Sequence, residues 1–285
     1  MTELSLFPDV DVPKPDAEDT RLWSVTTVLK VLASGGLDYW SKEQVAKALV
    51  GIRHSLVQRV DEDGEDEVVK WGINATYRKP KDRRSASQLG TDFHAIAEEI
   101  AITGTHGPVD AELAPLVAQF EDWLARAQPT YTAAEMPVYS LKYGHAGTCD
   151  GGLILQDVPL ILDYKTTAEP YNRQGQLKRP YPDAAIQLSA YRNSEWAVPV
   201  SPRRWEQHGR RYYLFGQPER DNAKPVPKYD GGIVIHVTPV SCEAYWATCD
   251  EETYQSFLYI EEAARWQNDL SKTAIGDKLI FERVA

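Results

Sequence analysis

The feature that most constrains the fold is a pair of apolar runs within residues 147–167, which read GTCDGGLILQDVPLILDYKTT. The runs GGLIL and VPLIL are separated by one short polar step, so we predict two paired strands joined by a turn at QDVP. The second run is apolar at consecutive positions, which is typical of a central strand covered on both faces. The sequence therefore predicts a sheet with helices packed against it.

Charged residues stand at the ends of these two predicted strands. Asp163 and Lys165 are two residues apart and share one face of a strand, whereas Tyr164 points to the other face. Asp150 precedes the first apolar run and comes close to them when the strands pair. Two carboxylates can bind a hard divalent cation, and a nearby lysine can stabilise negative charge on a reacting phosphodiester. A purely structural ion pair between Asp163 and Lys165 stays open as the alternative.

Hydrophobic periodicity divides the rest of the chain into helices, then strands, then mixed structure. We predict an acidic flexible leader over 1–20 and one α/β domain over 21–285, in which 21–130 is mainly helical and 131–250 forms the sheet core. Two polar segments are predicted as loops, 61–67 and the insertion 201–230. Predicted helices cover 24–33, 37–60 (as one longer helix or a broken pair), 85–102, 110–127, 182–196 and 250–270, the last within a C-terminal region 251–285. Predicted strands cover 134–140, 145–156, 158–166, 231–240 and 242–248.

Charge is distributed unevenly along the chain. The net charge of -11 argues against a nucleic-acid partner. However, residues 70–84 carry six basic side chains against one acidic, and residues 165–228 carry twelve against six. Such asymmetry is typical either of a nucleic-acid face on an acidic body or of solvated loops. Three scattered cysteines predict an intracellular protein without a disulfide framework, and no apolar run is long enough to predict a membrane span.

Two predicted helices carry further candidates. His94 and Glu98 are four residues apart on one helical face in GTDFHAIAEE, and small neighbours would allow His94 to approach the sheet. Gln187 and Tyr191 are spaced in the same way in QLSAY. Each pair alone is more commonly explained by packing than by function.

The order of these pieces, His94 in LGTDFHAIAEE, then GTCD, DYKT and QLSAY, resembles the RecB-type branch of the PD-(D/E)XK nucleases. Within that branch it is similar to phage-encoded exonucleases related to the CRISPR-associated four-cysteine nucleases, over residues 22–195. The resemblance implies a restriction-endonuclease-like core, a central mixed sheet flanked by helices with a helical N-terminal region. It also implies a DNA substrate and one or two Mg²⁺ or Mn²⁺ ions.

The resemblance assigns roles by position. It implies that Asp150, Asp163 and Lys165 are catalytic, and that His94, Asp150, Asp163 and the backbone carbonyl of Tyr164 bind metal. Glu135 matches a family position on the first strand, and we place it around these ligands together with Glu98, which shares a helical face with His94. The residues that we expect to contact DNA, in part from charge, are Gln187, Tyr191, Arg83, Arg84, Arg173, Lys178 and Arg179.

One departure from the relatives matters. They hold an iron–sulfur cluster with one cysteine upstream of the nuclease core and three near the C-terminus. Here no cysteine precedes Cys149, and only Cys242 and Cys249 follow it, so we expect no cluster. The function predicted is a metal-dependent DNA nuclease, an exonuclease acting in replication, recombination or repair in the cytoplasm, with other proteins of those pathways as further partners. A catalytically inactive DNA-binding module on the same fold and an unrelated acidic protein remain the alternatives.

Overall fold

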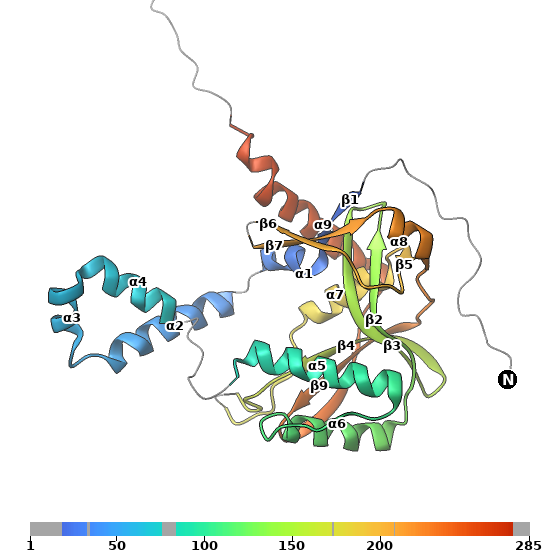
Figure 1. The fold of residues 1–285 in the computed structure, drawn as a ribbon, viewed down its shortest axis with the longest axis horizontal. Coiled ribbons are helices and arrows are strands. Elements are labelled where there is room, and N and C mark those ends of the chain that lie inside the picture. Colours follow the sequence, from blue (N-terminus) through green and yellow to red (C-terminus); the bar gives the residue numbers. More distant parts are fainter. Residues whose placement is uncertain (1–18, 33–34, 76–83, 173, 208, 276–285) are drawn as a thin grey trace, which may run out of the picture. The chain divides into compact units, whose positions relative to one another are not determined.

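A computed structural model describes residues 19–32, 35–75, 84–172, 174–207 and 209–275. It confirms the predicted fold class, an α/β protein whose central mixed sheet is flanked by helices (Figure 1). No helix in the described part of the chain combines the length and the apolar character needed to cross a lipid bilayer.

The strands of the sheet run in the order β10-β9-β4-β3-β1-β7-β6, with β2 pairing with β3 and β5, and β5 with β8. The strand bounds are β1 Thr20–Ser24, β2 Thr130–Ser140, β3 His145–Leu155, β4 Val158–Thr166, β5 Trp196–Ala197, β6 Arg204–Gln207, β7 Arg210–Phe215, β8 Lys224–Pro225, β9 Gly231–Thr238 and β10 Ser241–Ala247. The helix bounds are α1 Val25–Val28, α2 Gly35–Gly51, α3 Leu56–Asp63, α4 Glu65–Ala75, α5 Ala86–Thr103, α6 Ala114–Ala127, α7 Asp183–Arg192, α8 Gln217–Asn222 and α9 Glu251–Asn268, with 3₁₀ turns at Leu29–Leu32 and Leu270–Lys272.

The predicted hairpin is present as β3 and β4, which pair antiparallel from Gly151–Leu162 to Leu155–Val158. Its turn places Gln156 and Asp157 at positive φ, 50° and 67°, as a tight hairpin turn of this hand requires. On the far side, β4 pairs in parallel with β9, so it is a central strand as its apolar run predicted.

Strand β3 is the point at which the sheet divides. Along one edge it pairs with β2 over nearly its whole length. Along the other edge it pairs first with β1, at His145 and Ala146, and then with β4, from Gly151 onward. Residues 147–150 lie between these two pairings, so Thr148 and Asp150 stand where β1 and β4 separate. We call this stretch of β3 the fork.

Helices cover both faces of β4. The ring of Tyr164 makes edge contacts with Phe93 of α5 and Phe120 of α6, at centroid distances of 6.0 and 5.5 Å. Lys165, the next residue, instead approaches Gln187 of α7. Because successive strand residues point to opposite faces, α5 and α6 lie on one side of β4 and α7 on the other.

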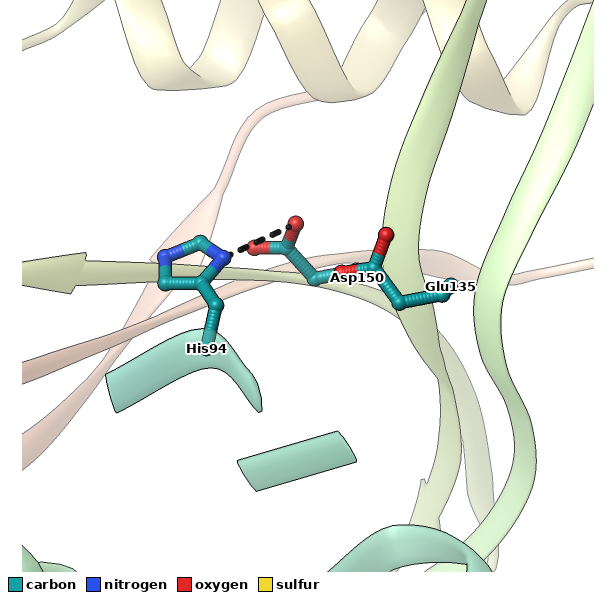
Figure 2. A group of neighbouring side chains, drawn as sticks. All are labelled: His94, Glu135 and Asp150. Carbon is teal, nitrogen blue, oxygen red and sulfur yellow. Dashed lines mark ion pairs between the residues drawn. The ribbon is translucent and has the colours of Figure 1, made fainter. Parts of the chain in front are cut away.

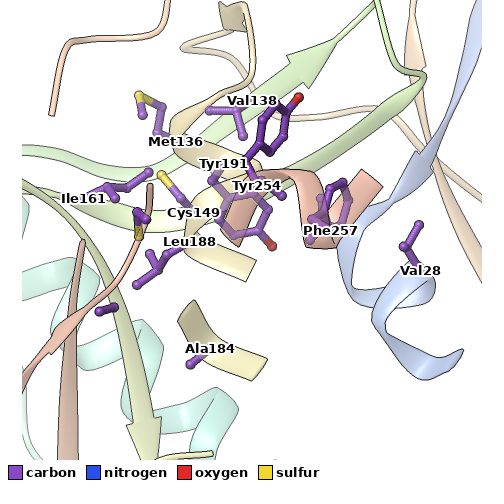
Figure 3. Packing of buried hydrophobic residues seen from close by; sticks show 14 of the residues in the cluster. Val28, Met136, Val138, Cys149, Ile161, Ala184, Leu188, Tyr191, Tyr254 and Phe257 are labelled. Carbon is purple, nitrogen blue, oxygen red and sulfur yellow. The ribbon is translucent and has the colours of Figure 1, made fainter. Parts of the chain in front are cut away.

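The core on the α7 side is built from buried residues of α1, β2, β3, β4, α7 and α9 (Figure 3). Leu188, Tyr191 and Phe257 are almost completely buried there. A Cβ added to Gly147 would lie 2.4 Å from Cε1 of Tyr191, so only glycine allows β3 to approach α7 this closely. The glycine of the GTCD motif is thus explained by packing against the QLSAY helix.

By Cα proximity the chain divides into two units, one of residues up to Val31 together with those from Gly90 onward, the other Leu32–Leu89. In the second unit α4 packs against α2, where Gly72 comes close to Val45 and Leu49. The boundary falls inside the region 21–130 that the sequence predicted as one helical part of a single domain.

The structure corrects three predictions of local structure. Residues 61–67 form the end of α3 and the start of α4, joined at Gly64, and not a loop. The predicted insertion 201–230 contains β6, β7, α8 and β8. The strand β1 was not predicted at all: it precedes the helix that begins after Ser24 and pairs with both β3 and β7. The predicted leader lies almost wholly outside the described residues.

Candidate metal centre

Three side chains that can bind a metal ion converge at the fork: His94 from α5, Glu135 from β2 and Asp150 from β3 (Figure 2). One potential ligand atom from each lies within 4.8 Å of those of the other two. Nδ1 of His94 is 3.4 Å from Oδ1 of Asp150. The sequence predicted His94 and Asp150 as ligands, whereas Glu135 was placed only around them.

Backbone conformation brings Glu135 into this group. Its neighbours Ala134 and Met136 pair with Gly151 and Cys149, so Glu135 stands opposite Asp150 across the β2–β3 ladder. Its φ is +42°, a left-handed conformation that is uncommon for a residue other than glycine. Such a conformation in a strand stores strain and is commonly associated with functional sites.

Tyr164 links Asp150 and His94 through its backbone. Its amide N–H donates to Oδ2 of Asp150 at 2.6 Å, and its carbonyl oxygen lies 3.1 Å from Nε2 of His94. When the ring is neutral with its proton on Nε2, that proton donates to the carbonyl and the lone pair of Nδ1 is left for a cation. When the ring is protonated, Nδ1–H instead donates to Asp150. In this arrangement the Tyr164 carbonyl orients the imidazole, which differs from the ligand role that the resemblance implied.

The electrostatics of the group favour a bound cation. Burial raises the pKa of Glu135 to about 7, and the negative charges of Asp150 and Glu98 act in the same direction. Burial lowers the pKa of His94, but the hydrogen bond and charge of Asp150 outweigh it, so that this pKa is raised overall. Repulsion between these carboxylates is relieved by a positive ion.

The donor set also fits a divalent cation in size and chemistry. Neighbouring ligands of an octahedral ion with metal–oxygen distances of about 2.1 Å are separated by about 3 Å, and opposite ligands by about 4.2 Å. The 3.4 Å between Nδ1 of His94 and Oδ1 of Asp150 is close to the first of these values. The two carboxylates suit Mg²⁺ and Mn²⁺, whereas the imidazole favours the softer of these ions, Mn²⁺.

Asp163 lies beside this group and is not one of its three members. Its side chain is buried, and Oδ1 accepts a hydrogen bond from Nζ of Lys165 at 2.7 Å. Burial raises the pKa of Asp163, while Lys165 opposes that rise. Burial lowers the pKa of Lys165, but the charge of Asp163 outweighs it and raises that pKa overall. The structure therefore contains the ion pair that was the alternative reading of these two residues, and it places that pair next to the triad.

Of the two α7 residues predicted at the site, Gln187 contacts Lys165 directly, and Tyr191 is connected to Lys165 through Gln187. Oε1 of Gln187 lies 3.5 Å from Nζ of Lys165, and Nε2 of Gln187 donates to the hydroxyl of Tyr191 at 3.2 Å. Gln187 is half-buried at the site. Tyr191 is only 2% exposed and belongs to the core, so its side chain does not lie at the surface where we expected it to contact DNA.

The predicted DNA-contacting cations are only partly described. Arg83 and Arg173 lie outside the described residues, and Arg84 belongs to the Leu32–Leu89 unit. Nζ of Lys178 lies 3.9 Å from Glu169, and the guanidinium of exposed Arg179 lies 5.1 Å from the ring centre of Tyr245. The three cysteines are unpaired and buried, with Cys149 in the core on the α7 side.

Comparison with known proteins adds little to this geometry. No protein-family model matches the chain, and no curated protein matches it. A solved structure titled "Crystal structure of SSO0001" is similar over 72% of this chain and 69% of its own, with 12% sequence identity and a TM-score of 0.29. Similarity at this level supports no inference about fold or function.

Proposed function

We propose that the protein is a metal-dependent DNA nuclease that hydrolyses phosphodiester bonds as an exonuclease. One observation carries this proposal: His94, Glu135 and Asp150 converge from three separate elements beside the buried Asp163–Lys165 pair. A cation-binding group next to a lysine is the combination that hydrolysis of a phosphodiester needs. A bound divalent cation would polarise the phosphate and lower the pKa of a coordinated water.

The chain's own residues have separable roles in this proposal. Lys165 supplies a fixed positive charge for the negative charge that develops on the phosphate. Asp163 keeps that ammonium charged in a buried setting and orients it, with Gln187 as a second hydrogen-bond partner. The Tyr164 carbonyl fixes the imidazole of His94, so that the triad is preorganised before substrate arrives.

The setting of the activity is also a proposal. Three unpaired cysteines suit a reducing compartment, so we place the protein in the cytoplasm. The similarity of its motifs to phage exonucleases suggests replication, recombination or repair as its pathway, together with other proteins of those pathways. Because the net charge is -11, DNA must be held by local basic groups, and binding should weaken steeply with salt.

The test compares linear and covalently closed circular DNA with Mg²⁺, Mn²⁺ or a chelator. We expect digestion of linear DNA with either cation and none with the chelator. Asp150→Asn should abolish cleavage, and Lys165→Met should reduce it by about 10²–10³-fold. Asp122→Asn, an exposed position on α6, is the matched control and should cleave like the wild type.

Two results would contradict the proposal. One is a folded wild-type protein that leaves DNA intact with both cations. The other is a folded Asp150→Asn variant that cleaves at the wild-type rate. Nicking of circular DNA would retain the nuclease assignment and overturn the exonuclease assignment.

A further inference from the structure

We propose that Arg204 is a positioning residue that binds a DNA phosphate neighbouring the one to be cleaved, an inference that rests on the proposed nuclease function. Arg204 is exposed and begins β6, at the far end of the sheet order from β9 and β10. The sequence placed it in a loop and gave it no role. Its side chain nevertheless returns to the fork that holds Asp150.

Two contacts fix the direction of the Arg204 side chain. Nη2 donates to Oγ1 of Thr148 at 3.2 Å, and the guanidinium carbon lies 5.4 Å from the centre of the Tyr213 ring. The Tyr213 hydroxyl lies 3.1 Å from the same Thr148 oxygen. Thr148 and Tyr213 therefore hold the guanidinium against β3.

Thr148 brings this charge next to the metal centre. It precedes Asp150 by two residues on β3, so the two side chains share a face and are separated by about 6.6 Å along the strand. A guanidinium at this distance from the triad is suited to the next phosphate along a strand whose scissile phosphate lies at the triad.

The bonding of Arg204 leaves it available for such a ligand. Within the described residues, it has no carboxylate within ion-pair distance. Arg203, its neighbour, is held by both Asp19 and Glu219. Arg204 uses one of its five N–H donors on a neutral hydroxyl, whereas a phosphate offers the bidentate, charged acceptor that a guanidinium prefers.

The experiment measures how strongly Arg204 is coupled to single phosphates. Cleavage of an oligonucleotide is compared with that of a series in which one phosphate at a time is replaced by a neutral methylphosphonate. Arg204→Gln should lower kcat/KM about tenfold, with little change in the rate at saturating DNA, and reduce the salt slope of binding by about one unit. Arg204→Lys should recover part of the loss, because it keeps the charge without the planar fork.

One methylphosphonate position next to the cleaved bond should lower kcat/KM in the wild type and have no further effect in Arg204→Gln, since both changes remove the same contact. Arg126→Gln removes one exposed arginine from α6 and is the charge-matched control; it should behave like the wild type at every position. Thermal unfolding confirms that each variant is folded.

The outcomes separate the two proposals. Suppose that the wild type cleaves DNA and that each methylphosphonate lowers kcat/KM by the same factor in Arg204→Gln as in the wild type. Arg204 is then not coupled to any single phosphate, so its proposed role is overturned and the nuclease assignment stands. If Arg204→Gln changes neither kcat/KM nor the salt slope of binding, the role of Arg204 is likewise overturned while the nuclease assignment stands. If the folded wild type does not cleave with Mg²⁺ or Mn²⁺, the nuclease assignment fails and the Arg204 proposal fails with it.

Discussion

Replacing Glu135 with glutamine tests whether the carboxylates at the fork destabilise the metal-free protein. Burial raises the pKa of Glu135 from its ordinary value of 4.5 to about 7. A carboxyl group whose pKa is raised on folding stabilises the protein only while it is protonated, so that contribution is lost as the pH rises through about 7. A shift of this size corresponds to at most about 3 kcal/mol. Because Glu135 is only half-buried, solvent screening reduces the expected change to about 1–2 kcal/mol.

The assay is urea unfolding between pH 5 and pH 8.5 with a chelator present. The free energy of unfolding of the wild type should fall by about 1–2 kcal/mol more over this range than that of Glu135→Gln. Glu243→Gln, at an exposed position of β10, is the control and should follow the wild type. Adding Mn²⁺ at pH 8 should restore stability to the wild type more than to Glu135→Gln, since a ligand that binds only the folded state stabilises it. Identical pH profiles for the wild type and Glu135→Gln would refute this account of the site.

Two further predictions concern neighbouring residues. Gly147→Ala should lower the free energy of unfolding by about 1–3 kcal/mol, because its Cβ would lie 2.4 Å from the Tyr191 ring; Gly51→Ala, where a Cβ meets nothing within 4 Å, is the control, and equal unfolding curves for the two variants would contradict the packing argument. His94→Ala should weaken Mn²⁺ binding more than Mg²⁺ binding in calorimetry, because imidazole suits the softer ion; unchanged affinity for both ions would remove His94 from the ligand set.

The parts of the fold that could be predicted are those whose local pattern decides their structure. The apolar run of β4 can be satisfied only by cover on both faces, and the structure provides it from α5 and α6 on one face and α7 on the other. Strands β6 and β7 lack such a pattern. Their sequences, RWEQ and RRYYLF, are rich in arginine, and β7 becomes a strand by pairing with β1 at the other end of the chain. The local sequence of β7 gives no sign that β1 is its pairing partner.

The residues of the candidate site also fall into those that the local sequence could predict and those that depend on how distant strands pair. His94 and Asp150 could be proposed because residue type and spacing suggested their chemistry. Glu135 enters the ligand group through its left-handed backbone and its position opposite Asp150, which depend on the register of two strands. Asp163 was expected in the ligand group, and the structure shows it paired with Lys165 beside the three converging side chains.

The position of β1 has a consequence for how the protein is made. Residues 20–24 leave the ribosome before the other described strands, yet they pair with His145 and Tyr212, more than a hundred residues later. Until β7 has been synthesised, β1 has an unsatisfied edge, and such edges promote aggregation in nascent chains. The fork needs β1, β3 and β4, so it cannot be complete before β4 has been synthesised. The candidate metal centre therefore cannot assemble until the chain has been synthesised through Tyr164, 70 residues after its first candidate ligand, His94.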